Sequence, residues 1–239
     1  MKTLLLRLSA PLQSWGSSSY YDTRDTDEIP TKSGIIGFLS AALGRKRNES
    51  VDDLNSLFFG VRVDHPGERI MDYHTTDMGD KLNTNISQRY YLSDAMFLVG
   101  LATDDISFLE EIYHAVSCPC YSLFLGRRSC PPTQPVNLGI RDFGLEDALR
   151  AEPWLMTDER RIRKEFGLNR KIRLRIVMDA VQNDDCFSRA AVKKDLPVSF
   201  SPYRREYRYR YVRETSVEIL RNLPEYVDDE HDPMRELGG

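Results

Sequence analysis

The pattern of apolar and polar positions predicts that the chain begins with a strand and a helix. Thr3–Ser9 is rich in leucine and is followed by Pro11, which predicts a short strand. Apolar residues then recur at helical spacing within Gly34–Leu43, which predicts a helix that Ser33 caps and Gly44 ends. Gly34 and Gly37, in the first turn of this helix, leave room for another backbone to approach closely, or leave the first amides open to an anion.

The next segments complete a recognisable order of elements. They are, in sequence, a short helix after Ser50, strands at Val61–Asp64 and Glu68–His74 joined at Pro66–Gly67, a mobile polar loop at Thr75–Ser87, a strand at Gln88–Ala102, a helix from Asp105 to Ser117 and a strand at Tyr121–Leu125. The order strand, helix, strand, strand, helix, strand is that of an α+β ferredoxin-like, or RNA-recognition-motif-like, fold. Both helices of such a fold pack on one face of the sheet, so we expect the other face to be free for a ligand.

The pattern changes beyond Gly126. Lys171–Ala180 and Arg205–Arg213 predict strands, and one short helix is predicted near Leu145–Ala151. The resulting organisation is a ferredoxin-like domain over residues 1–140 with a β-hairpin at about 71–92, a smaller strand-rich lobe over 141–224, and an acidic tail over 225–239.

The charge distribution of the chain is uneven. The 239 residues carry a formal net charge of −4, but the tail from Glu225 to Gly239 holds six acidic residues and one basic residue. Without the tail, the chain has 32 basic and 31 acidic residues. Arg160–Arg175 contains eight basic residues and one acidic residue, and Arg204–Arg213 contains five arginines and one acidic residue. Such local clusters are typical either of phosphate-binding surfaces or of ordinary solvated strands.

Composition excludes several other classes of protein. The four cysteines are too few for a disulfide scaffold, and the spacing of Cys118, Cys120 and Cys130 after His114 does not fit a zinc site. We therefore expect no metal and no cofactor. The longest apolar run, Ala95–Ala102, is far too short to span a bilayer, and the N-terminus lacks the apolar core of a signal peptide. These features predict a cytoplasmic protein that makes no membrane contact.

The sequence RREYRYRYVR at Arg204–Arg213 admits two interpretations. Strand periodicity places Tyr207, Tyr209 and Tyr211 on one face and Arg208 and Arg210 on the other. The favoured interpretation is a half-buried strand with its tyrosines turned inward and its arginines turned outward. The alternative is a face on which single-stranded nucleic acid stacks or along which its phosphates lie.

Two further segments are candidates for binding. The sequence GRRSCPP at Gly126–Pro132 predicts a constrained turn that holds two arginines for phosphates or carboxylates. Asp72–Thr76 and Gln88–Tyr91 place aromatic, hydroxyl and cationic side chains on one hairpin, a combination that suits splayed RNA bases and equally suits local packing. The motifs of nucleotide-binding loops, serine hydrolases and zinc proteases are absent from the sequence.

Five blocks of sequence carry a family resemblance. They are LRLSAPLQSWG at Leu6–Gly16, PTKSGIIGFLSAALG at Pro30–Gly44, DYHTT at Asp72–Thr76, YYLSDAMFLVGL at Tyr90–Leu101 and LGRRSCPPTQP at Leu125–Pro135. In this order and spacing, they resemble the CasD family of subunits of the type I-E CRISPR Cascade complex, within the RAMP superfamily. The resemblance covers about the first 140 residues, and no block beyond Asp142 matches.

The resemblance implies a non-catalytic RNA-binding subunit of an antiviral ribonucleoprotein complex. Such a subunit clamps the repeat-derived 5′ handle of the CRISPR RNA (crRNA), caps the backbone filament, and contacts the backbone, large and other subunits, and target DNA indirectly. The hairpin from Tyr73 to Tyr91 would be a thumb lying along the guide RNA. The candidate RNA contacts are Lys32, Ser33, Gly34, Tyr73, His74, Thr75, Arg89, Tyr90, Arg127, Arg128 and Ser129.

Two rival functions remain open at this stage. The first is a metal-independent endoribonuclease that processes CRISPR repeat RNA with His74 or Tyr73 as its acid–base group. A sister family that cuts repeat RNA uses a tyrosine and a lysine–histidine pair, and no Lys-His dipeptide occurs in this sequence. The second rival is a single-stranded RNA binder that belongs to no complex.

Overall fold

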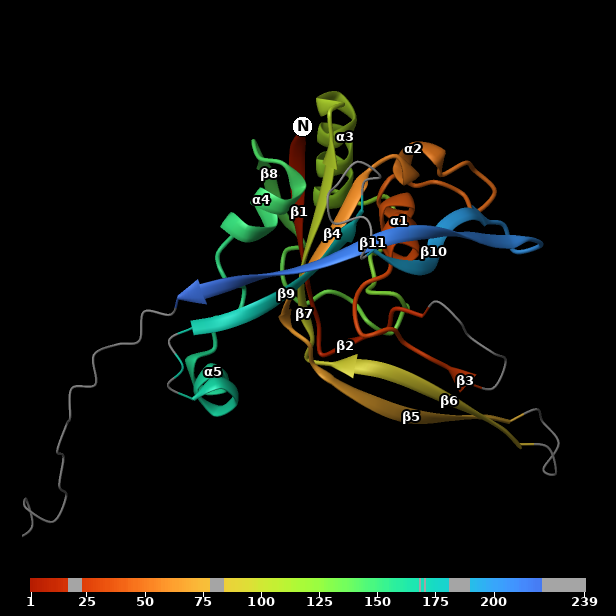
Figure 1. Ribbon diagram of the computed structural model, residues 1–239. Coiled ribbons are helices and arrows are strands. Elements are labelled where there is room, and N and C mark those ends of the chain that lie inside the picture. The colour runs from red at the N-terminus through yellow and green to blue at the C-terminus, as the bar shows by residue number, and fades with distance from the viewer. Residues whose placement is uncertain (17–22, 78–83, 168, 170, 181–189, 221–239) are drawn as a thin grey trace, which may run out of the picture.

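The main body of the molecule is a seven-stranded antiparallel sheet. The computed structural model describes residues 1–16, 23–77, 84–167, 169, 171–180 and 190–220. The strands lie in the order β10 (Ala191–Phe200), β11 (Arg205–Leu220), β9 (Lys171–Asp179), β4 (Phe58–His65), β7 (Met96–Thr103), β1 (Lys2–Ser9) and β8 (Asn137–Arg141) (Figure 1). Strands from both halves of the sequence therefore belong to one sheet, because β9 pairs with β4.

A second, smaller sheet projects from this body (Figure 1). It consists of the hairpin of β5 (Glu68–Asp77) and β6 (Thr84–Ser93), with β2 (Leu12–Gln13) and β3 (Thr23–Arg24) paired to β6. The predicted hairpin is thus confirmed, and its strands reach further than predicted into the segment expected to be a loop. The expected single strand at Gln88–Ala102 is wrong, because Asp94 adopts a φ of 56° and divides it between the two sheets.

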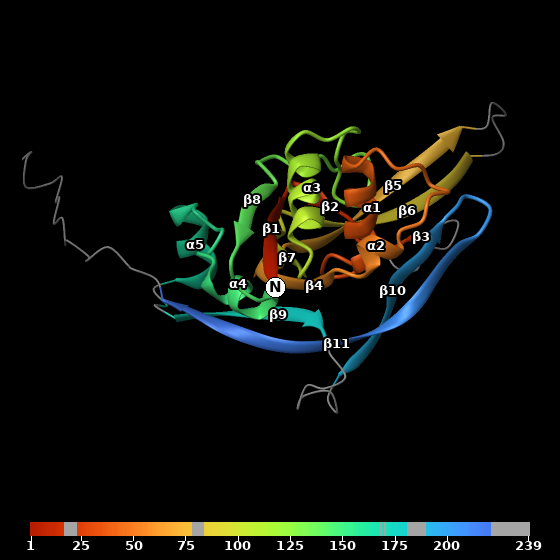
Figure 2. The same ribbon diagram turned by 90° about the horizontal axis from the view of Figure 1, so that it is seen from above.

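Helices cover both faces of the main sheet. On one face lie α1 (Lys32–Ala42) and α3 (Ile106–Ser117), and on the other lies α4 (Leu145–Ala151), while α2 (Asp52–Asn55) and α5 (Glu159–Phe166) are peripheral. Figure 2 shows α1 and α3 side by side on the same face. The expectation of a free sheet face is therefore wrong for the central strands.

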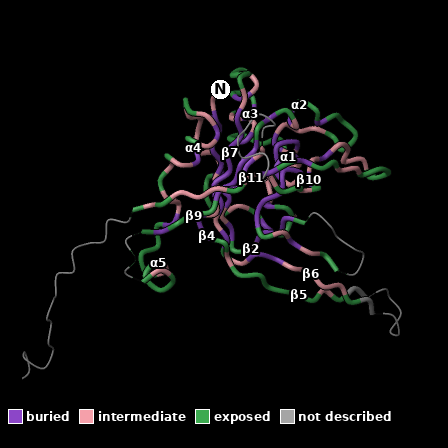
Figure 3. The backbone as a smooth tube through the Cα atoms, in the orientation of Figure 1, coloured by how far each residue is buried: buried purple, intermediate pink, exposed green. Residues whose placement is uncertain are grey.

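The sequence of β1 reflects this double covering. Leu4, Leu6 and Leu8 belong to the core cluster beneath α1 and α3, whereas Leu5 belongs to the cluster beneath α4. A strand that is buried on both faces needs a continuous apolar run rather than an alternating one. Figure 3 shows the resulting band of buried residues through the central strands. Gly60 and Gly100 are opposite each other in β4 and β7, where an added Cβ would collide with Leu145 or Leu149 of α4.

Several other elements begin or end at residues different from those predicted from the sequence. Thr31, and not Ser33, caps α1, because its side chain accepts a hydrogen bond from the Gly34 amide. The expected strand at Tyr121–Leu125 is irregular, and β8 occupies the sheet position beside β1. The predictions of α3, with Asp105 as its cap, and of α4 are confirmed. The prediction missed β10 and α5, and β11 extends beyond Arg213 to Leu220.

Candidate nucleic-acid interface

A basic, aromatic cavity of about 590 Å³ lies where α1, the turn after Leu125 and the β10–β11 pair meet. Its wall on α1 includes Ser33, Gly34 and Gly37. Its cations are Arg45, Lys46, Arg47, Arg128 and Arg205, and its aromatic residues are Phe38, Tyr121, Phe124, Phe200 and Tyr207. Among the described residues that line it there is no Asp or Glu. Cations that surround aromatic side chains suit the phosphates and unstacked bases of single-stranded RNA. We call this cavity the basic pocket.

Two glycines shape the α1 wall of the basic pocket. A Cβ on Gly34 would lie 2.9 Å from the Trp15 ring, so Gly34 lets the buried indole pack against the first turn of α1. The corresponding atom on Gly37 would point at the Phe200 ring at 3.8 Å. The expected close approach is therefore found at Gly34 alone, and the group that approaches is an aromatic side chain rather than another backbone. Gly37 leaves space between helix and strand.

The start of α1 is closed to an outside anion, contrary to the open amides considered from sequence. The backbone amide of Lys32 donates to Asp195 Oδ2 at 2.9 Å, and the Gly34 amide donates to Thr31 Oγ1 at 3.2 Å. The Lys32 side chain is only 7% exposed, and its ammonium donates to the Leu57 carbonyl and to Asp179. Lys32 therefore faces the protein interior, whereas its neighbours Ser33 and Gly34 line the basic pocket.

Asp195 belongs to a buried cluster of two cations and two carboxylates. Arg210 donates to both oxygens of Asp195, at 2.6 and 2.9 Å, and to Asp179 at 2.6 Å, while Lys32 bridges to Asp179 at 3.0 Å. Burial is the largest single influence on Asp195 and opposes its ionisation, but the hydrogen bonds and charge of Arg210, together with the Lys32 amide and the charge of Lys193, outweigh it and hold the pKa of this carboxyl below its usual range. We call these four residues the ion cluster.

The favoured prediction for Arg204–Arg213 is wrong over residues 209–211, whereas Arg208 is exposed as predicted and Tyr207 is half-buried. Tyr209 is 66% exposed and Tyr211 is 49% exposed, whereas Arg210 is 8% exposed. Arg210 points inward because Asp179 and Asp195 compensate its charge there. A strict alternation does not hold, because Arg208 and Tyr209 are both exposed, and the burial of Arg210 depends on carboxylates that lie 15 and 31 residues away.

The predicted constrained turn is present. Gly126 has a φ of 86°, and a Cβ there would collide with the Ser14 carbonyl oxygen. The turn is closed by hydrogen bonds from the Leu125 amide to the Cys130 carbonyl at 2.7 Å and from the Cys130 amide to the Arg127 carbonyl at 2.9 Å. A Cα substituent is thus excluded at Gly126, and the backbone on either side is held in place.

The two arginines of this turn have different surroundings. Arg127 donates to the Arg24 carbonyl at 2.9 Å and lies over the Tyr91 ring at 4.6 Å, so it joins the turn to the small sheet. Arg128 is exposed and lines the basic pocket, and Ser129 beside it is also exposed. Of the pair, Arg128 is the one available to a ligand.

The hairpin separates the remaining candidate residues onto two faces. Strand register places Tyr73, Thr75 and Tyr90 on one face, together with the exposed apolar side chains of Met71 and Ile86. The opposite face carries Asp72, His74 and Arg89, and His74 Nε2 lies 2.7 Å from Asp72 Oδ2. Tyr73 and His74 therefore point away from each other, so they do not share one catalytic site.

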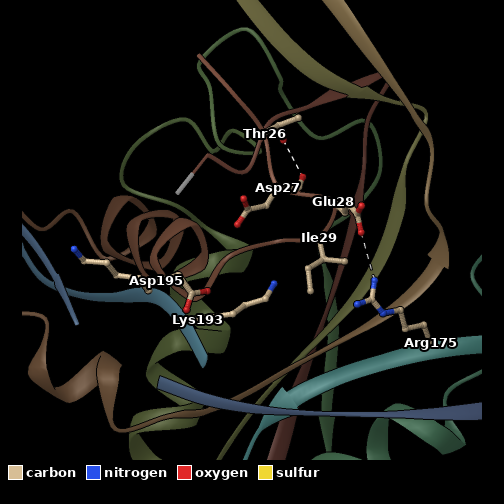
Figure 4. Close-up of a pocket in the computed structure, with 8 residues that line it drawn as sticks. Thr26, Asp27, Glu28, Ile29, Arg175, Lys193 and Asp195 are labelled. Atoms are coloured by element: carbon tan, nitrogen blue, oxygen red, sulfur yellow. Dashed lines mark hydrogen bonds and ion pairs between the residues drawn. The ribbon is translucent and has the colours of Figure 1, made fainter. Parts of the chain in front are cut away.

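A second cavity, of about 530 Å³, lies between residues 26–29 and strands β9 and β10 (Figure 4). Its lining mixes charges: Arg175 and Lys193 face Asp27 and Glu28, and Arg175 pairs with Glu28 at 3.6 Å. Carboxylates in this lining repel phosphates, so this cavity is less suited to RNA than the basic pocket. It also borders Asp195, so one member of the ion cluster lines this second cavity.

Sequence reasoning missed part of the basic pocket. Arg45, Lys46 and Arg47 follow directly after the helix-ending Gly44, so this basic triplet was a signal available in the sequence. Phe200 gave no such signal, because only the pairing of β10 with β11 places it opposite α1.

Two further observations concern metals and membranes. Within the described residues, no group of three or more His, Cys, Asp or Glu side chains is arranged to hold a metal ion. No helix in that part of the chain is long and apolar enough to cross a membrane.

Comparisons with known proteins identify the family of this chain. Residues 3–213 match the family model described as CRISPR-associated protein (Cas_Cas5). The chain belongs to the Cas5 family. It is 41% identical, over 159 residues, to the CRISPR system Cascade subunit CasD of Escherichia coli (strain K12), a match that covers 57% of this chain and 70% of the relative. The resemblance inferred from the five sequence blocks is therefore confirmed.

Solved structures share the Cas5 fold over most of the chain. A chain from a structure titled "CRISPR RNA-guided surveillance complex" superposes with a TM-score of 0.73 at 28% identity, covering 91% of each chain. A second, titled "Crystal structure of Cas protein", gives 0.68 at 37% identity and covers 90% of this chain and 94% of the other. The Cas5 fold of this protein is mixed α+β and rich in antiparallel strands.

Proposed function

We propose that this protein is a non-catalytic RNA-binding subunit of a CRISPR RNA-guided surveillance complex. In that role it clamps the 5′ handle of the crRNA and caps the backbone filament. The observation that carries the proposal is the basic pocket, where five cations and five aromatic residues meet without a carboxylate among the described lining residues. The names of the CasD relative and of the surveillance-complex structure support the assignment to such a complex.

The RNA contacts follow from which side chains are accessible. Ser33, Gly34 and Arg128 line the basic pocket, and Ser129 lies next to Arg128 on the exposed turn. On the hairpin, either the face with Tyr73, Thr75 and Tyr90 or the face with His74 and Arg89 lies along the guide RNA, and the other is left for a neighbouring subunit. Arg127 does not face the ligand; it attaches the turn to the small sheet through the Arg24 carbonyl and the Tyr91 ring.

The finer organisation of the chain is also part of this proposal. We infer a ferredoxin-like core from β1, α1, β4, β7, α3 and β8, which is supported by the antiparallel order β4-β7-β1-β8 and by α1 and α3 on one face. The hairpin serves as the thumb of residues 1–140. Residues 141–224 form the C-terminal lobe, whose β9 and β11 extend the same sheet. Residues 221–239, which contain the acidic tail, lie outside the described residues, as does the interior of the polar loop at 78–83.

The proposal is tested by recovering the RNA that the protein binds in cells. A tagged copy is purified from cells that express the neighbouring subunits and a CRISPR array, and the bound RNA is sequenced. The expected result is a population of RNAs that share one repeat-derived 5′ end. RNAs with random ends, or no RNA, would show that the family match reflects the fold alone.

The ribonuclease alternative leads to a separate prediction. His74→Ala and Tyr73→Phe are each expected to leave the maturation of the guide RNA unchanged, because their side chains lie on opposite faces of the hairpin. The measurement is the length of the guide RNA in cells that carry each variant. Accumulation of the uncut precursor in either variant would restore the ribonuclease function.

A further inference from the structure

We propose that Asp195 and Arg210 are positioning residues for the basic pocket, and that Lys32 acts with them from behind the pocket wall rather than on the RNA. This inference rests on the proposed function and deepens it. The three residues belong to the ion cluster, whose members come from α1, β9, β10 and β11. They hold the two walls of the pocket in a fixed relation to each other.

The first step concerns the end of α1. The N-terminus of a helix presents unpaired amides and a positive partial charge, which attract an anion. Here Asp195 of β10 supplies that anion, because its Oδ2 accepts the Lys32 amide at 2.9 Å and its side chain is only 2% exposed. Figure 4 shows Asp195 beside the coil of α1. The first turn of α1, which carries Ser33 and Gly34 in the pocket wall, is thereby attached to β10.

The second step concerns the opposite wall. Phe200 and Tyr207 line the pocket from β10 and β11, which lie at the end of the sheet and curve past α1 and α2 (Figure 2). The β10–β11 register shifts between Lys193 and Leu196, the interval that contains Asp195. An irregularity of this kind bends a strand and redirects a side chain. It therefore accounts for both the curvature of β10 and the inward position of Asp195.

The third step concerns the geometry of the Arg210 guanidinium. Arg210 uses its planar guanidinium to bind both oxygens of Asp195 and one oxygen of Asp179, and it lies over the Phe59 ring at 5.1 Å. A fork of this kind fixes orientation as well as distance, which a lysine ammonium does not. Buried ion clusters contribute little net stability. The role that fits the ion cluster is therefore to fix one arrangement of the chain.

The experiment compares affinity for two RNAs and its dependence on salt. The probes are a guide RNA with the 5′ handle recovered in the pull-down and an RNA of equal length with a scrambled handle, each titrated with the full-length protein between 50 and 200 mM salt. Asp195→Asn and Arg210→Lys are each expected to lower the affinity for the handle RNA at least tenfold. The affinity for scrambled RNA and the slope of log K against log salt are expected to stay unchanged, because no phosphate contact is lost.

The control and the opposing outcomes are as follows. Arg213→Met removes another arginine of β11, which pairs with Glu146 of α4 at 2.6 Å, and it is expected to leave both RNA affinities unchanged. Arg210→Lys keeps the charge, so it provides a second variant if Asp195→Asn fails to fold. A fall of about 0.7 in the salt slope would indicate direct phosphate contact and overturn the proposal. Unchanged handle affinity in both variants would also overturn it.

Failure of the proposed function has a different signature. If the wild-type protein does not distinguish handle RNA from scrambled RNA, the proposed function fails, and this inference fails with it. If the wild-type protein prefers handle RNA and the two variants keep that preference, only the positioning role is wrong.

Discussion

Arg62→Met is expected to lower the free energy of unfolding by about 3–5 kcal/mol, because it leaves a buried carboxylate without its partner. Arg62 and Asp64 are completely buried and form a two-point ion pair at 2.7 and 2.8 Å. The same guanidinium donates to the carbonyls of Leu149, Glu152 and Pro153, and so attaches the end of α4 to β4. The substitution leaves all these acceptors without the donor that now satisfies them, which urea unfolding at pH 7 would measure.

The pH dependence of this effect is also determined. Burial already raises the pKa of Asp64 although Arg62 opposes the shift, so removing Arg62 raises that pKa further. A carboxyl group whose pKa is higher in the folded state than in the unfolded state stabilises the fold at pH values below the unfolded-state pKa. This stabilisation is lost as the pH rises through the folded-state pKa. The loss in free energy of unfolding caused by Arg62→Met is therefore expected to be smaller near pH 4 than at pH 8.

A matched control is available in Arg141 of β8, which also contacts Glu152. Arg141 pairs with Glu152 at 3.0 Å but is one-third exposed, so Arg141→Met is expected to cost no more than about 1 kcal/mol. Equal losses for Arg62→Met and Arg141→Met would contradict a special role for the buried pair.

The second large effect is expected on RNA binding. Replacing Arg47, Arg128 and Arg205 together with glutamine should reduce the salt slope of RNA affinity by about 2, which is about 0.7 for each lost single-strand phosphate contact. All three side chains line the basic pocket. The measurement is a titration of full-length protein with single-stranded RNA at several salt concentrations.

The control for this experiment removes the same charge elsewhere. Arg160, Arg163 and Lys164 are exposed on α5, at the far end of the molecule from α1 (Figures 1 and 2). Replacing these three with glutamine changes the net charge equally but leaves the basic pocket intact. If both triple variants lose the same slope, RNA is attracted by overall charge and the basic pocket is not its site.

The sequence predicted the elements that depend on local patterns. Asp105 caps α3 as expected, because the side chain of an aspartate placed before an amphipathic run accepts a hydrogen bond from the backbone amide three residues later. The hairpin was also predicted, from the strand-like segments on either side of a polar loop, and so was the constrained turn after Leu125, where Gly126 permits a positive φ. Motif order identified the family. Apart from the motif order, each of these inferences used residues that are close together in the chain.

The inferences that failed depended on distant partners. Thr31 rather than Ser33 caps α1, and the strand beside β1 comes from Asn137–Arg141, because tertiary packing decided between similar local alternatives. The free face expected for the sheet is covered by α4, whose place depends on the facing Gly60 and Gly100. Nothing within a few residues of these positions distinguishes the two outcomes.

The sequence by itself thus determined the family, the helices α1, α3 and α4 with the hairpin, and the segments proposed to contact RNA. Only the tertiary structure decided the direction in which the charged side chains point. Lys32 and Arg210 both turn inward, because Asp179 and Asp195 are brought beside them by the pairing of β9, β10 and β11. A cation is buried only where a carboxylate compensates the loss of water, and these carboxylates are distant from Lys32 in the sequence.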